Sequence, residues 1–430
     1  MRLLFLFLLS ACLSSCSPAV RLGLQKAFEK TEKQFQDHTG FMLFDPEKNT
    51  TIYEFNSAKY FTPASNTKIF TFYTALRILG DSVPAFKYIE RNDSLIFWGT
   101  GDPSFLYRHS FNNTRVTNFL THAEKPLYFS TSNFHDDHFG PGWAWDDYSS
   151  AYSAEKSPFP VYGNILTLKK TGQVFSTSPD YFETFFSVGE RRKREEVERE
   201  LYSNAFQYHP GLGRTKNPPE WDIPMRTDPA LVLRLLSDTL KRIVNPCAVV
   251  QPPLAIPFYG IPADSLYRVM MQDSDNFIAE QLLLLCADVV SDTLQPEIAI
   301  RYVKENFLKD IPDEPPWVDG SGLSRYNLFT PRSIVHLWKK IYELRPREQL
   351  FPLLATGGVN GTVKNWYKAE KPYLFGKTGS LSNVHCLSGY LVTRSGKTLI
   401  FAFMNNNFVA PTSKVRTNMQ DLLKLIYEQY

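Results

Sequence analysis

The pattern of apolar residues is helical near both ends of the chain and strand-like between them. Residues 65–79 place apolar side chains on one broad face and are followed by Gly80, which predicts a helix that ends there. From 86 to 171 short apolar or alternating runs are broken by Gly, Pro, Asn and Asp, which is typical of strands and loops. The later part predicts helices at 228–243, 265–271 and 277–290, strands at 386–393 and 398–404, and a helix at 413–428. This order indicates one α/β domain interrupted by an inserted β-rich piece.

Composition excludes several classes of protein. The chain has 430 residues, of which 43% are hydrophobic and 21% are charged, as in an ordinary globular protein that is neither disordered nor polytopic. Its formal net charge of +3 is small for this length, so nucleic acid is not expected as a partner. The length alone favours about two to three domains.

The N-terminus indicates the cellular compartment. Arg2 precedes the apolar run 3–9, which is too short to span a membrane and is typical of a secretory signal peptide. The sequence L-S-S-C at 13–16 resembles a bacterial lipobox, whose cysteine becomes the lipidated first residue of the mature chain. We therefore expect a signal peptide at 1–15, a lipid on Cys16 and a membrane-attached lipoprotein that faces the periplasm of a bacterial envelope. The alternative is a plain secretory signal with a chance cysteine.

The remaining cysteines and histidines predict no metal site. Cys247, Cys286 and Cys386 are odd in number and lack C-x-x-C spacing, which indicates neither a complete disulfide framework nor a zinc site. The H-D-D-H sequence at 135–138 lies between Gly and Pro residues without a further spaced ligand. We expect no metal and no cofactor.

Two copies of an S-x-x-K motif occur, and only one begins an apolar helix. Ser65 and Lys68 follow Pro63 and open the predicted helix, whereas the copy at 153–156 lies in a polar stretch. Three residues are nearly one helical turn, so the amine of Lys68 is expected to lie over the Ser65 hydroxyl. The position also places Ser65 at the positive end of the helix dipole, where an anionic intermediate is favoured. The alternative for Ser65 is simple helix capping.

The motifs S-x-N and K-T-G also occur twice each. The S-D-N sequence at 274–276 lies at a break between two predicted helices, where polar side chains can point into a cleft, whereas the copy at 110–112 lies in a loop. The K-T-G-S sequence at 377–380 precedes two predicted strands, and Gly379 has no side chain that would keep a substrate away from the backbone. The copy at 170–172 predicts a hairpin turn. An N-cap is the alternative for Ser274, and a hairpin turn is the alternative at 377–380.

The selected copies occur in the order S-x-x-K, S-x-N, K-T-G, a trio found in penicillin-binding proteins and class A β-lactamases. With them the chain resembles the class C low-molecular-mass penicillin-binding proteins, the D-alanyl-D-alanine carboxypeptidase/endopeptidase family, over nearly its whole mature length. Further matching stretches are G-D-P at 101–103, G-W-A-W-D-D at 142–147, Asn164, S-D-N-F-I-A-E-Q at 274–281 and D-G-S-G-L-S-R at 319–325.

The resemblance implies a fold and a division into domains. It implies an α/β transpeptidase-like domain of the penicillin-binding/β-lactamase type, an antiparallel sheet flanked by helices, formed by 16–88 and 223–430 and interrupted by an inserted β-rich domain at 89–222. The short separation of the first two motifs predicts that one of the family's inserted domains is reduced or absent. Ser380 departs from the usual threonine but retains a hydroxyl.

The resemblance also implies a mechanism. Ser65 attacks the carbonyl of the penultimate D-Ala and forms an acyl-enzyme that water hydrolyses. Lys68 acts as the base, and burial together with the cation of Lys377 is expected to lower its pKa by about three units. Ser274 relays a proton to the leaving nitrogen, and the backbone N–H groups of Ser65 and Ser380 form the oxyanion hole.

Further residues are implied to bind the substrate. Asn276 hydrogen-bonds the substrate amide, while Lys377, Thr378 and Ser380 receive the terminal carboxylate. In the family, an acidic residue and an arginine grip the ends of a zwitterionic diaminopimelate side chain; here they correspond to Asp147 and Arg325. The alternative for this last pair is a surface ion pair.

These interpretations predict a serine DD-peptidase that acts on peptidoglycan stem peptides or their cross-links and is acylated by β-lactams. Two alternatives are a serine β-lactamase and a non-catalytic peptidoglycan-binding envelope protein. A β-lactamase needs fewer residues than this chain has, and a non-catalytic protein predicts damaged motifs, whereas these motifs are intact.

Overall fold

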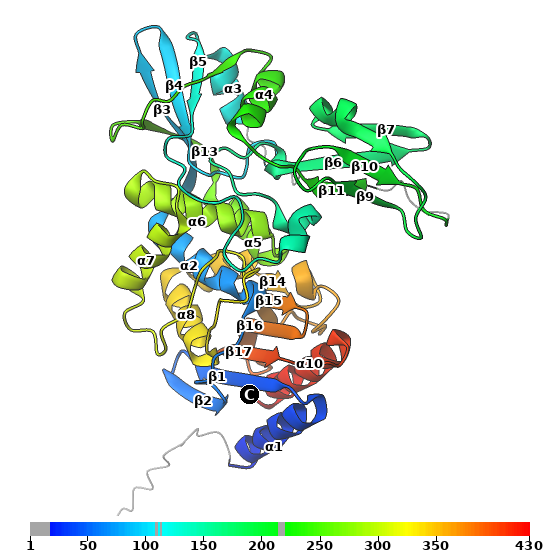
Figure 1. Ribbon diagram of the computed structural model, residues 1–430. Helices are drawn as coiled ribbons and strands as arrows, with labels where there is room; N and C mark the ends of the chain where they lie inside the picture. The colour runs from blue at the N-terminus through cyan, green and yellow to red at the C-terminus, as the bar shows by residue number, and fades with distance from the viewer. Residues whose placement is uncertain (1–17, 108–110, 112–113, 214–219) are drawn as a thin grey trace, which may run out of the picture.

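The computed structural model describes residues 18–107, 111, 114–213 and 220–430 (Figure 1). The predicted signal peptide, Cys16 and most of the unselected S-x-N copy lie outside the described residues. No helix in the described part of the chain has both the length and the apolar character needed to cross a bilayer.

A six-stranded antiparallel sheet joins the two ends of the chain (Figure 1). The first strand pairs with the last one, so that Phe41 lies opposite Phe403. In spatial order the strands are β14 (Ala355–Thr356), β15 (Leu374–Leu381), β16 (Val384–Val392), β17 (Thr398–Asn406), β1 (His38–Asp45) and β2 (Thr50–Phe55). The central sheet is therefore formed jointly by the N-terminal segment and the last third of the chain.

Helices cover both faces of this sheet. Successive residues of a strand point to opposite faces, and apolar residues occur at both kinds of position in these strands, so each face packs against helices. On β17, Phe401 and Phe403 pack in the core with two helices, α1 (Pro18–Phe35) and α10 (Thr412–Gln429). Ile400 and Ala402 belong to the core on the opposite face. That face carries α2 (Lys68–Ile78), α5 (Ala263–Gln272), α6 (Asn276–Ser291), α7 (Pro296–Phe307) and α8 (Pro331–Leu344), with the short α9 (Arg347–Leu350) nearby. The predicted α/β class, an antiparallel sheet flanked by helices, is confirmed.

The inserted region forms three further sheets and has its own apolar core (Figure 1, upper part). A mixed five-stranded sheet contains β12 (Val244–Pro246), β5 (Leu127–Ser130), β4 (Ser94–Gly99), β3 (Ser82–Arg91) and β13 (Ile256–Pro262), accompanied by α3 (Thr114–His122) and α4 (Pro229–Leu240). Two three-stranded sheets contain β11 (Glu220–Pro224), β6 (Ile165–Thr171) and β7 (Val174–Ser178), and β8 (Phe186–Val188), β10 (Phe206–His209) and β9 (Glu196–Arg199).

The predicted domain boundaries, 88/89 and 222/223, fall within β3 and β11. The stretch expected to contain only strands and loops includes the helix α3, whose single apolar face is short. The division into domains stays a prediction.

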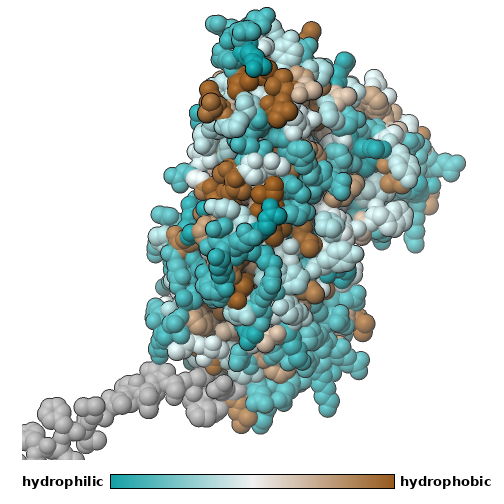
Figure 2. Space-filling model, turned by 60° about the vertical axis from the view of Figure 1, so that its left-hand side comes forward, coloured by the Kyte–Doolittle hydropathy of each residue, from teal (hydrophilic) through white to brown (hydrophobic). Residues whose placement is uncertain are grey.

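The molecular surface carries no single dominant apolar region on the face shown in Figure 2, where several small hydrophobic patches are separated by hydrophilic residues. Isolated apolar residues of this kind are normal on a globular surface.

Candidate active site

The S-x-x-K motif forms the turn that leads into α2. Ser65 lies in the 3₁₀ turn η1 (Ala64–Thr67), and Lys68 is the first residue of α2. Lys68 Nζ donates a hydrogen bond to Ser65 Oγ at 3.0 Å, as the three-residue spacing predicts. Pro63 occupies the N-cap position of η1 and no side chain caps this turn, so the Ser65 hydroxyl does not serve as a helix cap.

Lys68 is fully buried and has two further fixed acceptors. Its Nζ donates to Asn276 Oδ1 at 2.6 Å and to the Ser321 carbonyl at 2.8 Å. In the neutral amine these two acceptors take the two N–H groups, so the lone pair faces Ser65 Oγ. Burial lowers the pKa of Lys68 to about 8, against the opposing effect of nearby carboxylates that include Glu280. The geometry and the pKa together suit a proton acceptor for the Ser65 hydroxyl.

The S-D-N and K-T-G motifs meet beside this turn. Ser274 precedes α6 with φ of +65°, and Asp275, not Ser274, caps the helix by accepting from the Ile278 N–H at 2.9 Å. Lys377 Nζ donates to Ser274 Oγ at 2.8 Å. The structure therefore brings Ser65, Lys68, Ser274 and Lys377 into one cluster, in which both lysines are buried and both serines are partly exposed. Capping does not account for Ser274.

Both lysines have pKa values below the ordinary value of a lysine. Burial lowers the pKa of Lys377 well below its ordinary value, and the cation of Lys68 lowers it further. For Lys68 burial is the main cause of the lowering, and nearby carboxylates oppose it. Because repulsion between two cations is mutual, each lysine disfavours protonation of the other.

Asn66, which the sequence analysis did not single out, ties η1 to the central sheet. Its Nδ2 donates to the Lys377 carbonyl at 3.2 Å, and its Oδ1 accepts from Ser388 Oγ at 2.5 Å. Trp338 Nε1 donates in turn to Ser388 Oγ at 2.9 Å. Because all four residues are fully buried, this network fixes the distance between the nucleophile turn and the K-T-G strand.

Gly379 is required for a different reason than the one expected. A Cβ at this position would lie 2.4 Å from the Pro63 carbonyl oxygen and 2.9 Å from the Ser65 nitrogen. The missing side chain therefore allows β15 to approach the backbone of η1, and it is the protein's own backbone, not the substrate, that occupies the space. This contact places the edge of β15 beside the Ser65 N–H.

Thr378 and Ser380 are two residues apart on β15 and so project to the same side of the strand. Thr378 Oγ1 donates to Thr362 Oγ1 at 2.7 Å. Ser380 Oγ lies 2.8 Å from His385 Nδ1, and the two residues face each other across the β15–β16 pair. Both predicted carboxylate-binding hydroxyls therefore lie on the strand that carries Lys377.

Asp147 and Arg325 lie in different surroundings and are not paired. Asp147 accepts from the Tyr152 hydroxyl at 2.6 Å, and the Tyr152 carbonyl accepts from Asn276 Nδ2 at 3.0 Å. Arg325 Nη2 donates to the Ser382 carbonyl at 3.1 Å, next to the turn between β15 and β16. Among the described ion pairs none joins Asp147 to Arg325, so the alternative of a surface ion pair between them is not observed. Their role in substrate binding stays a prediction.

Two buried carboxyl groups, also not singled out from the sequence, support the Lys68 site from behind. Glu280 accepts from the backbone N–H groups of Gly320 and Ser321 at 3.1 and 2.7 Å, and Asp319 accepts from Trp143 Nε1 at 3.1 Å. Burial and the nearby Asp319 raise the pKa of Glu280 to about 7. Glu280 and Asp319 lie inside the stretches 274–281 and 319–325, which match the family. This match is the feature of the sequence from which they could have been identified.

The lysines of the other S-x-x-K and K-T-G copies form ion pairs elsewhere in the structure. Lys156 of the second S-x-x-K copy is buried, although a polar stretch was expected, and forms an ion pair with Asp136. Lys170 of the second K-T-G copy forms an ion pair with Glu195 at 2.9 Å, at the end of β6. Neither copy contributes to the Ser65 cluster.

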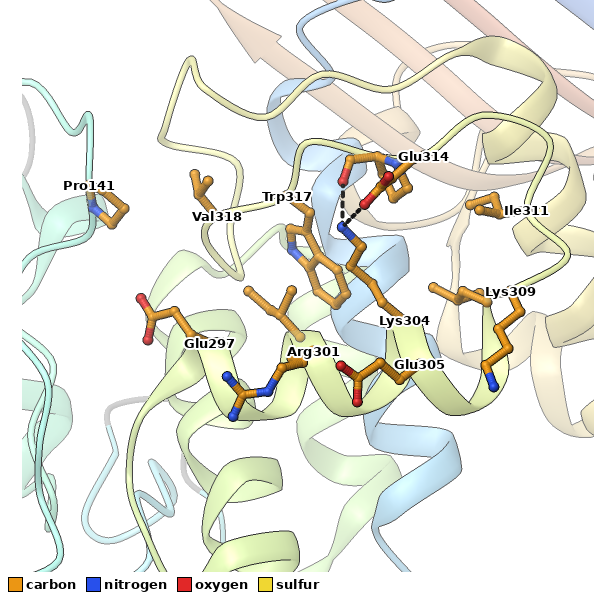
Figure 3. Close-up of a pocket in the computed structure, with 13 residues that line it drawn as sticks. Pro141, Glu297, Arg301, Lys304, Glu305, Lys309, Ile311, Glu314, Trp317 and Val318 are labelled. Atoms are coloured by element: carbon orange, nitrogen blue, oxygen red, sulfur yellow. Dashed lines mark hydrogen bonds and ion pairs between the residues drawn. The ribbon is translucent and has the colours of Figure 1, made fainter.

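The structure also has a cavity of about 720 Å³ away from these residues, between α7 and the segment 308–318 (Figure 3). Ile300, Leu308 and Trp317 form apolar parts of its wall, and an ion pair between Lys304 and Glu314 crosses its rim at 2.8 Å. None of the predicted site residues lines it, so this cavity is distinct from the candidate active site.

Comparison with known proteins identifies relatives over most of the chain. D-alanyl-D-alanine carboxypeptidase DacB of Haemophilus influenzae is 22% identical over 437 residues, which cover 90% of this chain and 89% of the relative. The crystal structure of penicillin-binding protein 4 from the same organism superposes with a TM-score of 0.76 at 20% identity, over 93% of this chain and 99% of that chain. A second crystal structure of that protein, in complex with a β-lactam, gives a TM-score of 0.70 at 18% identity, over 93% and 99% of the two chains. At these identities the solved structures establish a common fold.

The family assignment rests on a longer sequence pattern than the three motifs. The pattern of the D-Ala-D-Ala carboxypeptidase 3 (S13) family matches residues 23–429. Because this match includes both parts of the central sheet and the whole inserted region, the chain belongs to the D-Ala-D-Ala carboxypeptidase 3 (S13) family, which confirms the predicted resemblance to the carboxypeptidase class of penicillin-binding proteins.

Proposed function

We propose that the protein hydrolyses the D-Ala-D-Ala bond of peptidoglycan stem peptides through an acyl-enzyme on Ser65. One observation carries the proposal: two hydroxyls and two buried amines from three distant motifs meet in one cluster, with contacts of 3.0 Å between Lys68 Nζ and Ser65 Oγ and 2.8 Å between Lys377 Nζ and Ser274 Oγ. Buried amines held beside hydroxyls are costly unless paired, and they suit proton transfer.

In the acylation step the neutral amine of Lys68 accepts the Ser65 proton while Oγ attacks the carbonyl carbon of the penultimate D-Ala. The resulting oxyanion is stabilised by the backbone N–H groups of Ser65 and Ser380, each worth about 3–4 kcal/mol. Ser274, which contacts Lys377, passes its proton to the leaving nitrogen and recovers one from protonated Lys68 through the lysine amines, so that the C–N bond breaks, free D-Ala departs and Lys68 is neutral again. Water then hydrolyses the Ser65 ester and restores the hydroxyl.

The rest of the site supports substrate binding. Asn276 Oδ1 accepts from Lys68 and retains a second lone pair for the substrate amide N–H. Lys377, Thr378 and Ser380 share one strand, where they offer a cation and two hydroxyls to the terminal carboxylate. The bond to be cleaved then lies between this strand edge and Ser65.

Asp147 and Arg325 extend the proposal to D-Ala-diaminopimelate bonds. An acidic group and a cation on different sides of the site complement the two ends of a zwitterionic diaminopimelate side chain. Incubation of the purified protein with muropeptides, read by mass spectrometry, distinguishes loss of D-Ala from cleavage of a cross-link. Double substitution Asp147→Asn and Arg325→Gln should reduce cleavage of diaminopimelate-containing peptides more than cleavage of lysine-containing ones.

The N-terminal sequence supports a location in the cell envelope. We infer that the protein is a lipoprotein anchored through Cys16 and exposed to the periplasm, after removal of residues 1–15. In cells fed a labelled fatty acid, the wild type should take up label and sediment with membranes, whereas Cys16→Ser should be unlabelled. A labelled Cys16→Ser protein contradicts the anchor.

The experiment that tests the catalytic proposal is release of D-Ala from a purified pentapeptide muropeptide. The wild type should release D-Ala and Ser65→Ala should not. Equal release by both proteins contradicts the assignment of Ser65. β-Lactams are expected as covalent inhibitors, as a crystal structure of the H. influenzae relative with a β-lactam supports. A long-lived penicillin adduct agrees with a peptidase, while rapid turnover of penicillin indicates a β-lactamase.

A further inference from the structure

A buried histidine stands behind the Ser380 hydroxyl and connects it to a cation on the C-terminal helix. His385 lies on β16 directly opposite Ser380 on β15, with 2.8 Å between Ser380 Oγ and His385 Nδ1. On the other side of the ring, Arg416 Nε of α10 donates to His385 Nε2 at 3.4 Å. The three side chains therefore form a linear chain of hydrogen bonds that ends at the strand edge of the site.

The protonation of this chain follows from valence. A guanidinium only donates hydrogen bonds, so His385 Nε2 has to present its lone pair to Arg416. A neutral imidazole that accepts at Nε2 carries its proton on Nδ1, and this N–H donates to Ser380 Oγ. The Ser380 hydroxyl then accepts from His385, and its own hydrogen is available for another acceptor.

His385 remains neutral while it does so. Burial lowers its pKa to about 3, and the nearby charge of Arg416 acts in the same direction. The ring is almost fully buried, so water does not compete for either nitrogen. His385 Nδ1–H consequently remains a donor to Ser380 Oγ at neutral pH.

From this geometry we infer that His385, held in one tautomer by Arg416, turns the Ser380 hydroxyl hydrogen towards the carboxylate of the substrate. The inference rests on the proposed function, in which Ser380 receives that carboxylate. His385 and Arg416 are positioning residues, because they act through Ser380. The other hydroxyl of the strand differs, since Thr378 donates to Thr362 and has no such partner behind it among its described hydrogen bonds.

The test compares two substrates that differ only in the recognised group. One is an acyl-D-alanyl thioester of thioglycolate, which carries a terminal carboxylate, and the other is the corresponding thioglycolamide. The measured quantity is the ratio of kcat/KM for the carboxylate over the amide. His385→Leu removes the donor and should lower this ratio about tenfold, whereas His385→Asn, whose Nδ2 can replace Nδ1–H, should keep it within about threefold of the wild type.

Arg416→Met provides a second variant in case His385→Leu does not fold, because Arg416 is only partly buried. This substitution removes the donor to His385 Nε2, so His385 can adopt either neutral tautomer. The ratio of kcat/KM for the carboxylate over the amide should then fall about threefold. Lys414→Met is the matched control, since Lys414 is an exposed cation on the same helix, and its ratio should equal that of the wild type.

The inference is overturned if His385→Leu lowers both kcat/KM values equally or leaves the ratio unchanged, or if Arg416→Met matches Lys414→Met. Failure of the proposed function gives another result: the wild type then hydrolyses neither thioester faster than Ser65→Ala does.

Discussion

At the scale of single residues, the two buried lysines are distinguished by their partners. Lys68 contacts the Ser65 hydroxyl and lies near several carboxyl groups, which partly oppose the effect of burial on its pKa. Lys377 contacts Ser274 and the Thr378 carbonyl, and among the described residues no carboxyl group raises its pKa. Lys68, the base, and Lys377, the carboxylate-binding residue, are both buried, but carboxyl groups raise the pKa of Lys68 alone.

The pH dependence of acylation should report the pKa of Lys68. Only the neutral amine accepts the Ser65 proton, so the rate should rise about tenfold per pH unit below pH 8 and level off above it. Stopped-flow labelling with a fluorescent penicillin between pH 5.5 and 9.5 measures this profile. Lys68→Ala should slow labelling about 10²–10⁴-fold and remove the rise. A profile that falls with pH contradicts the role of Lys68.

Substitution of Glu280 should shift that profile in a defined direction. The carboxylate of Glu280 raises the pKa of Lys68, and with its own pKa of about 7 it is mostly ionised where Lys68 titrates. Glu280→Gln removes this charge and should move the midpoint of the profile to lower pH. The plateau rate should also fall, because the amide cannot accept from both backbone N–H groups that Glu280 holds. A midpoint shifted upwards disagrees with this arrangement.

At the scale of elements, the site depends on the close approach of η1 to β15. The Asn66 network sets this distance from one side, and the missing side chain of Gly379 permits it from the other. Ala64, the residue before the nucleophile, has φ of +47°, a conformation that costs a non-glycine residue about 1–3 kcal/mol. A Cβ at Gly322 would lie 1.9 Å from the Ala64 carbonyl oxygen, so the surrounding loop is packed tightly against this turn.

Gly379→Ala tests the contact between η1 and β15. The added Cβ would overlap the Pro63 carbonyl, so the turn should move and acylation by penicillin should slow about 100-fold. Gly172→Ala in the other K-T-G copy is the matched control. No atom lies within 4 Å of its Cβ, although its φ of +65° should cost roughly 1–2 kcal/mol of stability. Equal acylation rates in the two variants would falsify this account of the motif.

At the scale of the whole molecule, α6 links the inserted region to the active site. Its first residue, Asn276, contacts Lys68 and the Tyr152 carbonyl, while Gln281 further along contacts two segments of the insert. Gln281 Nε2 donates to the carbonyls of Gly101 and Ser157 at 2.8 and 2.9 Å, and Oε1 accepts from the Ser157 N–H at 3.1 Å. The insert is therefore attached to the helix that positions a substrate-binding residue.

Gln281→Leu should weaken this attachment. The substitution leaves three buried backbone groups without partners, at a cost of about 1–3 kcal/mol each. The free energy of unfolding, measured by denaturant titration, should fall accordingly. Val289→Ala, at an exposed position of the same helix, should change it by less than about 0.5 kcal/mol. Indistinguishable unfolding curves for the two variants would show that the Gln281 contacts are not needed.

The sequence was sufficient to predict the long, strongly periodic elements. The helix expected at 277–290 is α6 (Asn276–Ser291), and the strand expected at 398–404 is β17 (Thr398–Asn406). The helix α3 was not predicted, because its apolar face is short and the sequence on either side of it has a strand-like pattern. Pairing of β1 with β17 could not be predicted either, since it joins segments more than 350 residues apart and periodicity carries no information on such contacts.

Contacts within the site could be predicted where both residues belong to one short motif and their spacing is about one helical turn. Ser65 and Lys68 meet for that reason. Contacts that depend on tertiary packing were not accessible, among them the Asn66 network and the pairing of His385 with Ser380. The need for Gly379 was foreseen, but the atoms that fill the space belong to η1, which only the fold reveals.

Reaction with benzylpenicillin, followed by intact-protein and peptide mass spectrometry, is the decisive test of Ser65 as the nucleophile. We expect one adduct per molecule, located on the peptide that contains Ser65, absent in Ser65→Ala and unchanged in Ser153→Ala, the serine of the other S-x-x-K copy. An adduct that persists in Ser65→Ala, or that maps to another residue, would contradict this assignment.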